Sequence, residues 1–256
     1  MPFPKWWLPL KYESPMYVMI TTFFVFALLE RVFTGYPWPK QPLWIARGLA
    51  WLAMVVLFNH FTVSTIDMMV PQYLFIDFSG MGLWALVPGI LIYEVALYGY
   101  HRALHDVPYL WRLHQTHHST ERLDIWSAYH IHPVELLGWS FVGAFVFRVL
   151  LGTTIETAFW FGIFITTIQT IQHANIRTPK WLGYLIARPE NHMLHHARGK
   201  HRANYADLPI IDMLFGTFAL PENVPKEVGF WDGASQRFVE QMLGKDVTKP
   251  TNPIQR

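Results

Sequence analysis

Histidine is the residue type in this sequence that points most clearly to chemistry. Of the 256 residues, 13 are histidine and none is cysteine. Eight of the histidines fall into three short motifs, HRALH, HQTHH and HMLHH. These eight are His101, His105, His114, His117, His118, His192, His195 and His196. Their type and spacing indicate metal ligands.

The spacing of the motifs suits a site with more than one metal ion. On a helix, positions i, i+3 and i+4 lie on one side, so each motif stacks its imidazoles on one face. Neighbours such as His117 and His118 differ by about 100° in direction, so that one triplet can address two ions. Imidazole favours iron, copper, zinc, nickel or cobalt over magnesium and calcium. Eight neutral ligands exceed what one ion holds, which predicts two ions.

Composition excludes several other chemistries and indicates a membrane protein. Without cysteine there are no disulfides, thiolate zinc sites, iron–sulfur clusters or cysteine nucleophiles. The net charge of +2 is small and scattered, which argues against a nucleic-acid partner. Hydrophobic residues make up 52% and charged residues 15%, against about 25% charged in soluble domains. The expected solvent is a lipid bilayer.

Five apolar stretches approach the roughly 20 residues that a helix needs to cross a bilayer. They run over residues 16–34, 43–60, 82–100, 134–150 and 155–172. Each could cross the bilayer or dip deeply into it, which predicts four to five transmembrane or re-entrant helices. Residues 1–15, with Trp6 and Trp7 beside lysines, are typical of an interfacial segment.

The distribution of charge predicts which side of the membrane carries the histidines. Basic loops stay on the cytoplasmic side, and arginines follow the third stretch whereas residues 61–81 contain no Lys or Arg. The last two stretches are joined near Gly152 and should form a hairpin. Residues 101–132 and 173–201 should then share one cytoplasmic face. The sequence therefore predicts an all-α integral membrane protein with a helical cytoplasmic cap carrying a histidine-rich di-metal site.

Glu94 is the one carboxylate well inside an apolar stretch. Together with Tyr98, His101 and His105 it forms a single helical stripe. Ligating histidines usually donate their second ring N–H to a carboxylate or carbonyl, so we expect Glu94 to hold such an imidazole. The alternative is a protonated acid bonded to a neighbouring helix.

The order and gaps of the histidine motifs resemble the fatty acid hydroxylase/sterol desaturase superfamily of membrane-bound non-haem di-iron oxygenases. Further matching segments are HHSTERLD, HPVE, QHAN and NYADLPIIDMLFGTF, so that the resemblance covers about residues 84 to 218. Ala206 and Ile211 depart from the common glycine and tryptophan. Gln169 stands where some fatty acyl hydroxylases carry histidine, which favours the sterol-type or general bacterial-type branch.

The resemblance implies roles for individual residues. The eight motif histidines would bind two irons, with His173 as a ninth ligand. Three roles remain open for His132: a metal ligand, a hydrogen-bond partner of a ligand, or a histidine held against Pro133. Residues implied to support the ligands are Glu94, Asp124, His132, Asn175 and Asp212. For His60, His130 and His201 we expect ordinary interfacial or solvated rings.

The resemblance also implies O2-dependent hydroxylation or desaturation of a membrane lipid, whether sterol-like, fatty acyl or otherwise hydrophobic. The sequence has no GxGxxG nucleotide motif and no possible iron–sulfur ligand set, so electrons should come from an external ferredoxin, cytochrome b5 or flavin reductase type of donor. Arg198, Lys200 and Arg202 could dock an acidic donor, although topology alone would explain their charge.

Two other classes remain open at this point. One is a histidine-rich zinc-dependent membrane hydrolase, which iron content and O2-dependent turnover would separate from an oxygenase. The other is a metal transporter or sensor, which needs ligands along a path through the bilayer. We expect an interfacial segment over residues 1–15, a catalytic domain over 16–218, and a surface helix near 234–243 followed by a frayed tail from Gly244.

Overall fold

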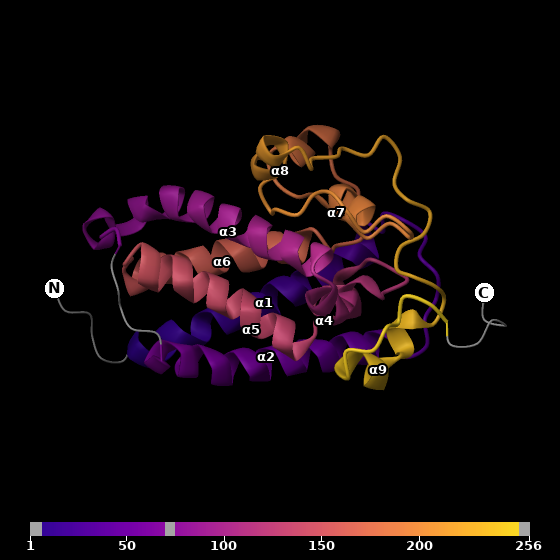
Figure 1. Ribbon diagram of the computed structural model, residues 1–256, viewed down its shortest axis with the longest axis horizontal. Helices are drawn as coiled ribbons and strands as arrows, with labels where there is room; N and C mark the ends of the chain where they lie inside the picture. The colour runs from indigo at the N-terminus through magenta and orange to yellow at the C-terminus, as the bar shows by residue number, and fades with distance from the viewer. Residues whose placement is uncertain (1–6, 70–74, 251–256) are drawn as a thin grey trace.

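The computed structural model describes residues 7–69 and 75–250, and within these ranges the chain is helical without a β-strand (Figure 1). An isolated antiparallel bridge joins Ala197 to Val228. The predicted all-α class is confirmed. Of the predicted interfacial segment, the residues up to Trp6 lie outside the described ranges, and Trp7 is the first residue of helix α1.

Long apolar helices form an elongated bundle (Figure 1). Its members are α1 (Trp7–Val32), α2 (Trp44–Met69), α3 (Leu86–Asp106), α5 (Pro133–Ala144) with its π-helical continuation η3 (Phe145–Leu150), and α6 (Ile155–Ile171). Each contains one of the five predicted apolar stretches or most of it. A short 3-10 segment, η1 (Ser79–Ala85), leads into α3.

Three helical segments in the described part of the chain are long and apolar enough to cross a membrane: Trp44–Thr62, Ser79–Asp106 and Pro133–Leu150. Helix α6 has 17 residues and packs along α1. The chain is therefore an integral membrane protein, while the predicted total of four to five crossings stays a prediction.

Short helices form a cap at one end of the bundle (Figure 1). They are α4 (Pro108–His118), α7 (Pro189–His195), α8 (Pro209–Phe215) and α9 (Phe238–Met242), with the 3-10 turns η2 (Ile125–Ser127), η4 (Lys180–Tyr184) and η5 (Ala234–Gln236). Three of these helices, and α5 as well, begin with a proline at the first turn. Proline fits there because its fixed φ suits a helix and its missing N–H would have no helical partner.

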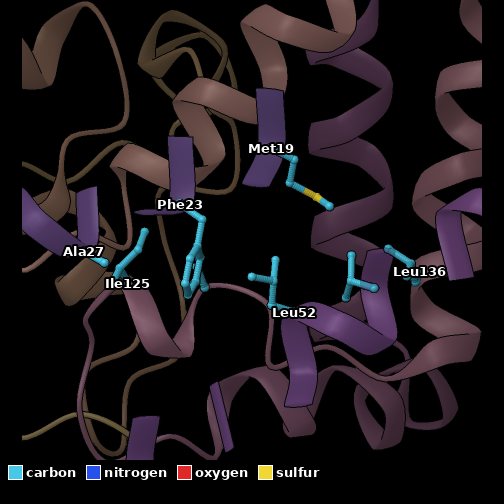
Figure 2. Close-up of a cluster of buried hydrophobic side chains, with 8 residues drawn as sticks. Met19, Phe23, Ala27, Leu52, Ile125 and Leu136 are labelled. Atoms are coloured by element: carbon cyan, nitrogen blue, oxygen red, sulfur yellow. The ribbon is translucent and has the colours of Figure 1, made fainter. Parts of the chain in front are cut away.

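A hydrophobic cluster joins the cap to the bundle. Phe23 of α1, Leu52 of α2 and Ile125 of η2 are buried side chains of this cluster (Figure 2). Beside it, the Glu30 carboxylate accepts hydrogen bonds from the backbone N–H groups of Ile125 and Asn175. One acid near the end of α1 thus fixes two cap segments that are far apart in sequence.

Two connections expected from the sequence can be compared with the structure. Gly152, at φ +50°, lies between η3 and α6 and allows the left-handed turn of the predicted hairpin. The tail is not frayed as far as Pro250. Val247 is buried, and its carbonyl accepts a hydrogen bond from Trp231 Nε1 while its N–H donates to the Gln115 side chain. The sequence pattern missed this because the partners lie on α4 and on a distant loop.

Gly48 is the point where α2 approaches η2 most tightly. A Cβ atom there would lie 2.7 Å from the Trp126 carbonyl oxygen and 2.9 Å from the Trp126 Cβ. We predict that Gly48→Ala lowers the free energy of unfolding by about 1–3 kcal/mol, the usual cost of overpacking. Thermal unfolding in detergent measures this change. Gly99→Ala is the control, because a Cβ at Gly99 meets nothing within 4 Å; equal effects of the two variants would contradict the prediction.

Candidate metal centre

The cap and the cap-facing ends of the bundle helices bring the predicted histidines together. Helix α3 contributes the first pair and α4 the second motif. His173 follows the end of α6, and the third motif occupies α7 and its C-terminal cap residue. Four chain segments that are separated in sequence therefore converge on one buried volume.

The nine histidines form two adjacent groups, within each of which the potential ligand atoms lie within 4.8 Å of one another. The five-histidine group contains His101, His105, His114, His118 and His195. The four-histidine group contains His117, His173, His192 and His196. Each group could hold a metal ion. His105 is half-buried and the other eight are buried.

Adjacent histidines diverge between the two groups, as the helical spacing predicts. His117 belongs to the four-histidine group and His118 to the five-histidine group. His195 and His196 divide in the same way. The groups touch where the His118 and His196 rings stack with centroids 4.2 Å apart. Two ions bound here would therefore be neighbours.

Hydrogen bonds on the outer ring nitrogens fix the tautomers of several imidazoles. His101 Nδ1 lies 2.6 Å from the Tyr205 carbonyl oxygen, and His114 Nδ1 lies 2.8 Å from Glu135 Oε1. Because both acceptors are oxygens, each Nδ1 carries the proton, and in the neutral ring Nε2 keeps its lone pair. His173 and His195 are held in the same way by the carbonyl oxygens of Gln169 and Ala203.

Where both outer nitrogens are held, as in His101 and His114, the inner nitrogens face each other without a proton to share. The Nε2 atoms of His101 and His114 lie 3.2 Å apart. In the other group His173 Nε2 lies 3.2 Å from His117 Nε2 and 3.0 Å from His192 Nε2. The two lone pairs of His101 and His114 repel at this spacing unless a cation lies between them. The donor set therefore fits metal ions that favour imidazole.

Burial keeps these imidazoles in the neutral form that binds metals. Desolvation lowers the pKa of His173 to about 4. The same cause, with nearby histidines second, holds the pKa of His117, His118, His192 and His196 well below 6.5. At neutral pH no proton must leave these rings before a metal binds.

Glu135 is the carboxylate that contacts a group histidine, and the sequence reasoning missed it. Its Oε1 accepts the bond from His114 Nδ1 and another from Trp139 Nε1 at 3.0 Å. Its Oε2 has no hydrogen-bond partner in the structure. The signal was present, because Glu135 is an isolated acid in the first turn of the apolar helix α5, and Glu94 is an isolated acid inside the apolar helix α3.

Glu94 and Asp212 have backbone partners instead of imidazoles. Glu94 Oε2 accepts a hydrogen bond from the Leu208 N–H at 2.9 Å. Asp212 accepts bonds from the N–H groups of Tyr205 and Ala206, both at 2.8 Å. We expected these two acids to contact an imidazole directly. They bind the backbone of the loop that carries the Tyr205 carbonyl instead. Asp212 thus supports the residue whose carbonyl holds His101, while Glu94 contacts Leu208, three residues further along the chain.

The remaining expected support residues also lie outside the histidine contacts. The Asp124 carboxylate accepts bonds from Trp44 Nε1, the Arg122 side chain and the Trp126 N–H. Asn175 exchanges side-chain hydrogen bonds with the Tyr36 backbone. His132 caps α5, with Nδ1 accepting from the Val134 N–H, and belongs to neither group. Of its three open roles, the structure supports a histidine held beside Pro133.

The three histidines expected to be ordinary differ from one another. His60 is exposed. His130 is buried, with its ring 4.3 Å from the Trp51 ring and Nε2 3.3 Å from Gln241 Oε1. His201 is half-buried with Nδ1 3.0 Å from His118 Nδ1. His201 thus contacts a group histidine, which its position five residues beyond HMLHH did not reveal.

A cavity of about 170 Å³ opens beside the two groups. Its histidine wall contains members of both groups, including His101, His117 and His173. The rest of the lining comes from the bundle and the cap, with apolar side chains such as Leu97 and Trp139. A ligand in this cavity would touch both the histidines and the membrane helices.

An apolar helical bundle with two adjacent groups of buried histidines at one end defines a class of membrane protein with a candidate site for metal ions. The chain belongs to the fatty acid hydroxylase family, whose sequence profile matches residues 86–217, more than half of the chain. The predicted resemblance is confirmed at this level. The matched region contains all nine group histidines.

Curated relatives are named for the oxidation of several lipids. The chain is 28% identical over 82% of its length to alkylglycerol monooxygenase of Xenopus tropicalis, of which it covers 49%. It is 30% identical over 61% of its length to ornithine lipid hydroxylase OlsE of Rhizobium tropici, again covering 49%. A putative Delta(7)-sterol-C5(6)-desaturase 2 of Arabidopsis thaliana is 28% identical over 52% of the chain, which covers 47% of it. The chain thus spans about half the length of these relatives, and no solved structure matches it.

Glu135→Gln tests the support of His114. The amide has the size of the carboxylate but lacks its charge and can present N–H to the ring instead of oxygen. We predict a 10- to 100-fold loss of metal affinity, as for other partners of ligating histidines, measured by competition with a chelator. Glu156→Gln, at an exposed position on α6, should retain wild-type affinity. Equal affinity of the two variants would contradict the role assigned to Glu135.

His130 gives a prediction for pH. Burial, followed by the nearby Arg47 charge, lowers its pKa from 6.5 to about 3. As the pH falls, His130 therefore takes up its proton at a higher pH in the unfolded chain than in the folded protein. The contribution of neutral His130 to the free energy of unfolding is complete above pH 6.5 and is lost as the pH falls toward 3. The loss approaches about 1.4 kcal/mol per pH unit for one group. His130→Phe keeps an aromatic ring beside Trp51, and its unfolding free energy should fall less than that of the wild type between pH 7 and 4; parallel curves would refute this.

Proposed function

We propose that this protein is an O2-dependent di-iron oxidoreductase that hydroxylates or desaturates a C–H bond of a membrane lipid. The observation that carries the proposal is the convergence of ring nitrogens from two groups of histidines beside a cavity lined by the membrane helices. The names of the curated relatives support a lipid substrate.

In this proposal each histidine group holds one iron, and the pair supplies O2 activation and oxidation of an unactivated C–H bond when bound. The chain's own residues provide the fixed geometry. Glu135 Oε1 and the Tyr205 carbonyl hold protons on His114 Nδ1 and His101 Nδ1. This keeps both Nε2 atoms directed at the metal position and prevents the rings from turning.

The substrate would enter the cavity from the bilayer. Apolar lining residues come from several bundle helices, including Met19 of α1, Val55 of α2 and Leu136 of α5. Transfer of a lipid chain from bilayer to cavity changes little apolar exposure to water, so shape and polar contacts must select the substrate. The same walls keep bulk water away from the reacting carbon.

Electrons would come from a separate reductase of the ferredoxin, cytochrome b5 or flavoprotein type, and we place the site on the cytoplasmic side by the distribution of basic loops. Arg198 pairs with Glu227 and Asp232, and Arg202 lies 3.6 Å from Asp106. These pairs reduce the charge available to an acidic donor. The docking surface therefore needs more than Arg198, Lys200 and Arg202.

Metal analysis and lipid mass spectrometry test the proposal together. Protein purified anaerobically in mild detergent should contain two irons per chain, and with a reductase it should incorporate label from isotopic O2 into a lipid or desaturate it. Full activity with zinc alone, or turnover without O2, would support the hydrolase alternative instead.

Single substitutions test the histidine assignment. His105→Ala, His117→Ala and His195→Ala each remove a member of a group, so each should abolish turnover at equal protein level. His60→Ala is the control because His60 is exposed and belongs to neither group. Turnover that survives in any of the three group variants would contradict the assignment.

A further inference from the structure

Most polar side chains that line the cavity have partners within the protein. The amide nitrogens of Gln169 and Gln172 donate to the Asp207 carboxylate at 3.1 and 3.2 Å. The Tyr129 hydroxyl lies 3.0 Å from Thr170 Oγ1. The Asn204 amide donates to two backbone carbonyls. These hydrogen bonds fix the shape of the cavity wall and leave few donors or acceptors for a ligand.

Asn59 and Thr166 are different. Both line the cavity and both are half-buried. Neither the Asn59 amide nor the Thr166 hydroxyl has a side-chain hydrogen bond to any residue that the structure describes. Asn59 lies on a segment long and apolar enough to cross the membrane. Neither polar end is among the fully buried atoms without a partner, so both reach open space, where a ligand could pair them.

The two side chains reach the cavity from different helices. Asn59 belongs to α2, which runs along one edge of the bundle in Figure 1, while the first histidine pair belongs to α3 along the opposite edge. Thr166 lies on α6, about two helical turns before His173. A molecule in the cavity therefore has histidines on one side and two unpaired polar groups within the same small space.

The cavity volume limits how far apart these contacts can be on one ligand. A cavity of about 150 Å³ accommodates benzene, and this one is about 170 Å³. By that comparison the cavity holds a ring or chain segment of roughly six to seven heavy atoms, and a longer lipid would extend through its open side. An amide offers two donors and one acceptor, and a hydroxyl offers both functions, so the matching ligand group is a hydroxyl, ether, ester or amide.

We propose that the substrate carries such a hydrogen-bonding group in the segment that the cavity encloses together with the carbon that is oxidised, and that Asn59 and Thr166 bind it. The substrate is then a lipid oxidised near its polar portion, and a plain hydrocarbon stretch or a terminal methyl group fits the site poorly. This inference rests on the proposed function and adds the position of the reacting carbon to it.

Two small probes of equal heavy-atom count test the polar contacts without turnover. Cyclohexanol presents a hydroxyl, and methylcyclohexane replaces it by a methyl group. Purified wild-type protein in liposomes is compared with Asn59→Leu/Thr166→Val, and the saturable part of probe binding is measured by headspace gas chromatography against protein-free liposomes. Thr167→Val is the matched control, because Thr167 is a neighbouring half-buried threonine that does not line the cavity.

We expect the double substitution to weaken cyclohexanol binding about 10-fold, the effect of losing one to two hydrogen bonds. Methylcyclohexane binding should stay unchanged, and Thr167→Val should bind both probes as the wild type does. If the double variant loses its metal or aggregates, Thr166→Val alone should still weaken cyclohexanol about 3-fold. Equal effects on the two probes, or none on cyclohexanol, overturn the inference and leave the two side chains as sites for water.

The probe assay needs neither O2 nor a reductase, so its outcome is separate from that of the oxidation assay. Lipid oxidation together with equal effects of the substitutions on both probes overturns this inference alone. Discrimination between the probes without any O2-dependent change in a lipid supports the polar contacts and counts against the proposed oxidation.

Discussion

Neutral imidazoles converging in a buried space impose the constraint on which the rest of this structure depends. Each ring has two nitrogens, and only a ring whose outer nitrogen keeps the proton can direct a lone pair inward. The outer acceptors are the Tyr205, Gln169 and Ala203 carbonyls and the Glu135 carboxylate. Gln169 and Ala203 are only four and eight residues from the histidines they hold. Tyr205 and Glu135 lie on other parts of the chain than His101 and His114, so the geometry of these two rings depends on tertiary contacts.

The loop of residues 201–206 meets this constraint through an unusual backbone. His201, Ala203 and Asn204 have positive φ angles of 45°, 73° and 53°, in the region that favours glycine. Side chains hold the loop in place, since Asn204 bonds to the backbone of Asn191 and Ala219. The outcome is that two carbonyls of one short loop point at imidazoles from two helices. The free-energy cost of the left-handed residues is offset by these bonds and those of Asp212.

The fold class and the clustering of the eight motif histidines were predictable from sequence because both follow from local periodicity, whereas His173 was implied by the family resemblance alone. Apolar stretches of sufficient length become helices in a bilayer, and i, i+3, i+4 spacing fixes which ring faces which side. His117 and His118 diverge for that reason alone. The partners of the rings were not predictable in this way. Glu94 and Glu135 are both isolated acids in apolar helices, and only tertiary packing decides that Glu135 reaches an imidazole while Glu94 reaches a backbone N–H.

Coupling between the bundle and the cap follows from the same contacts. Glu30 near the end of α1 binds the N–H of Asn175, two residues after His173, and also that of Ile125. Glu135 begins a helix that enters the membrane region while its carboxylate holds His114. A displacement of α1 or α5 in the bilayer would therefore move a histidine as well as a wall of the cavity. Because the ring nitrogens lie only about 3 Å apart, such a displacement would change the distances between them, so the membrane helices help to set the spacing of the histidine nitrogens as well as to anchor the protein.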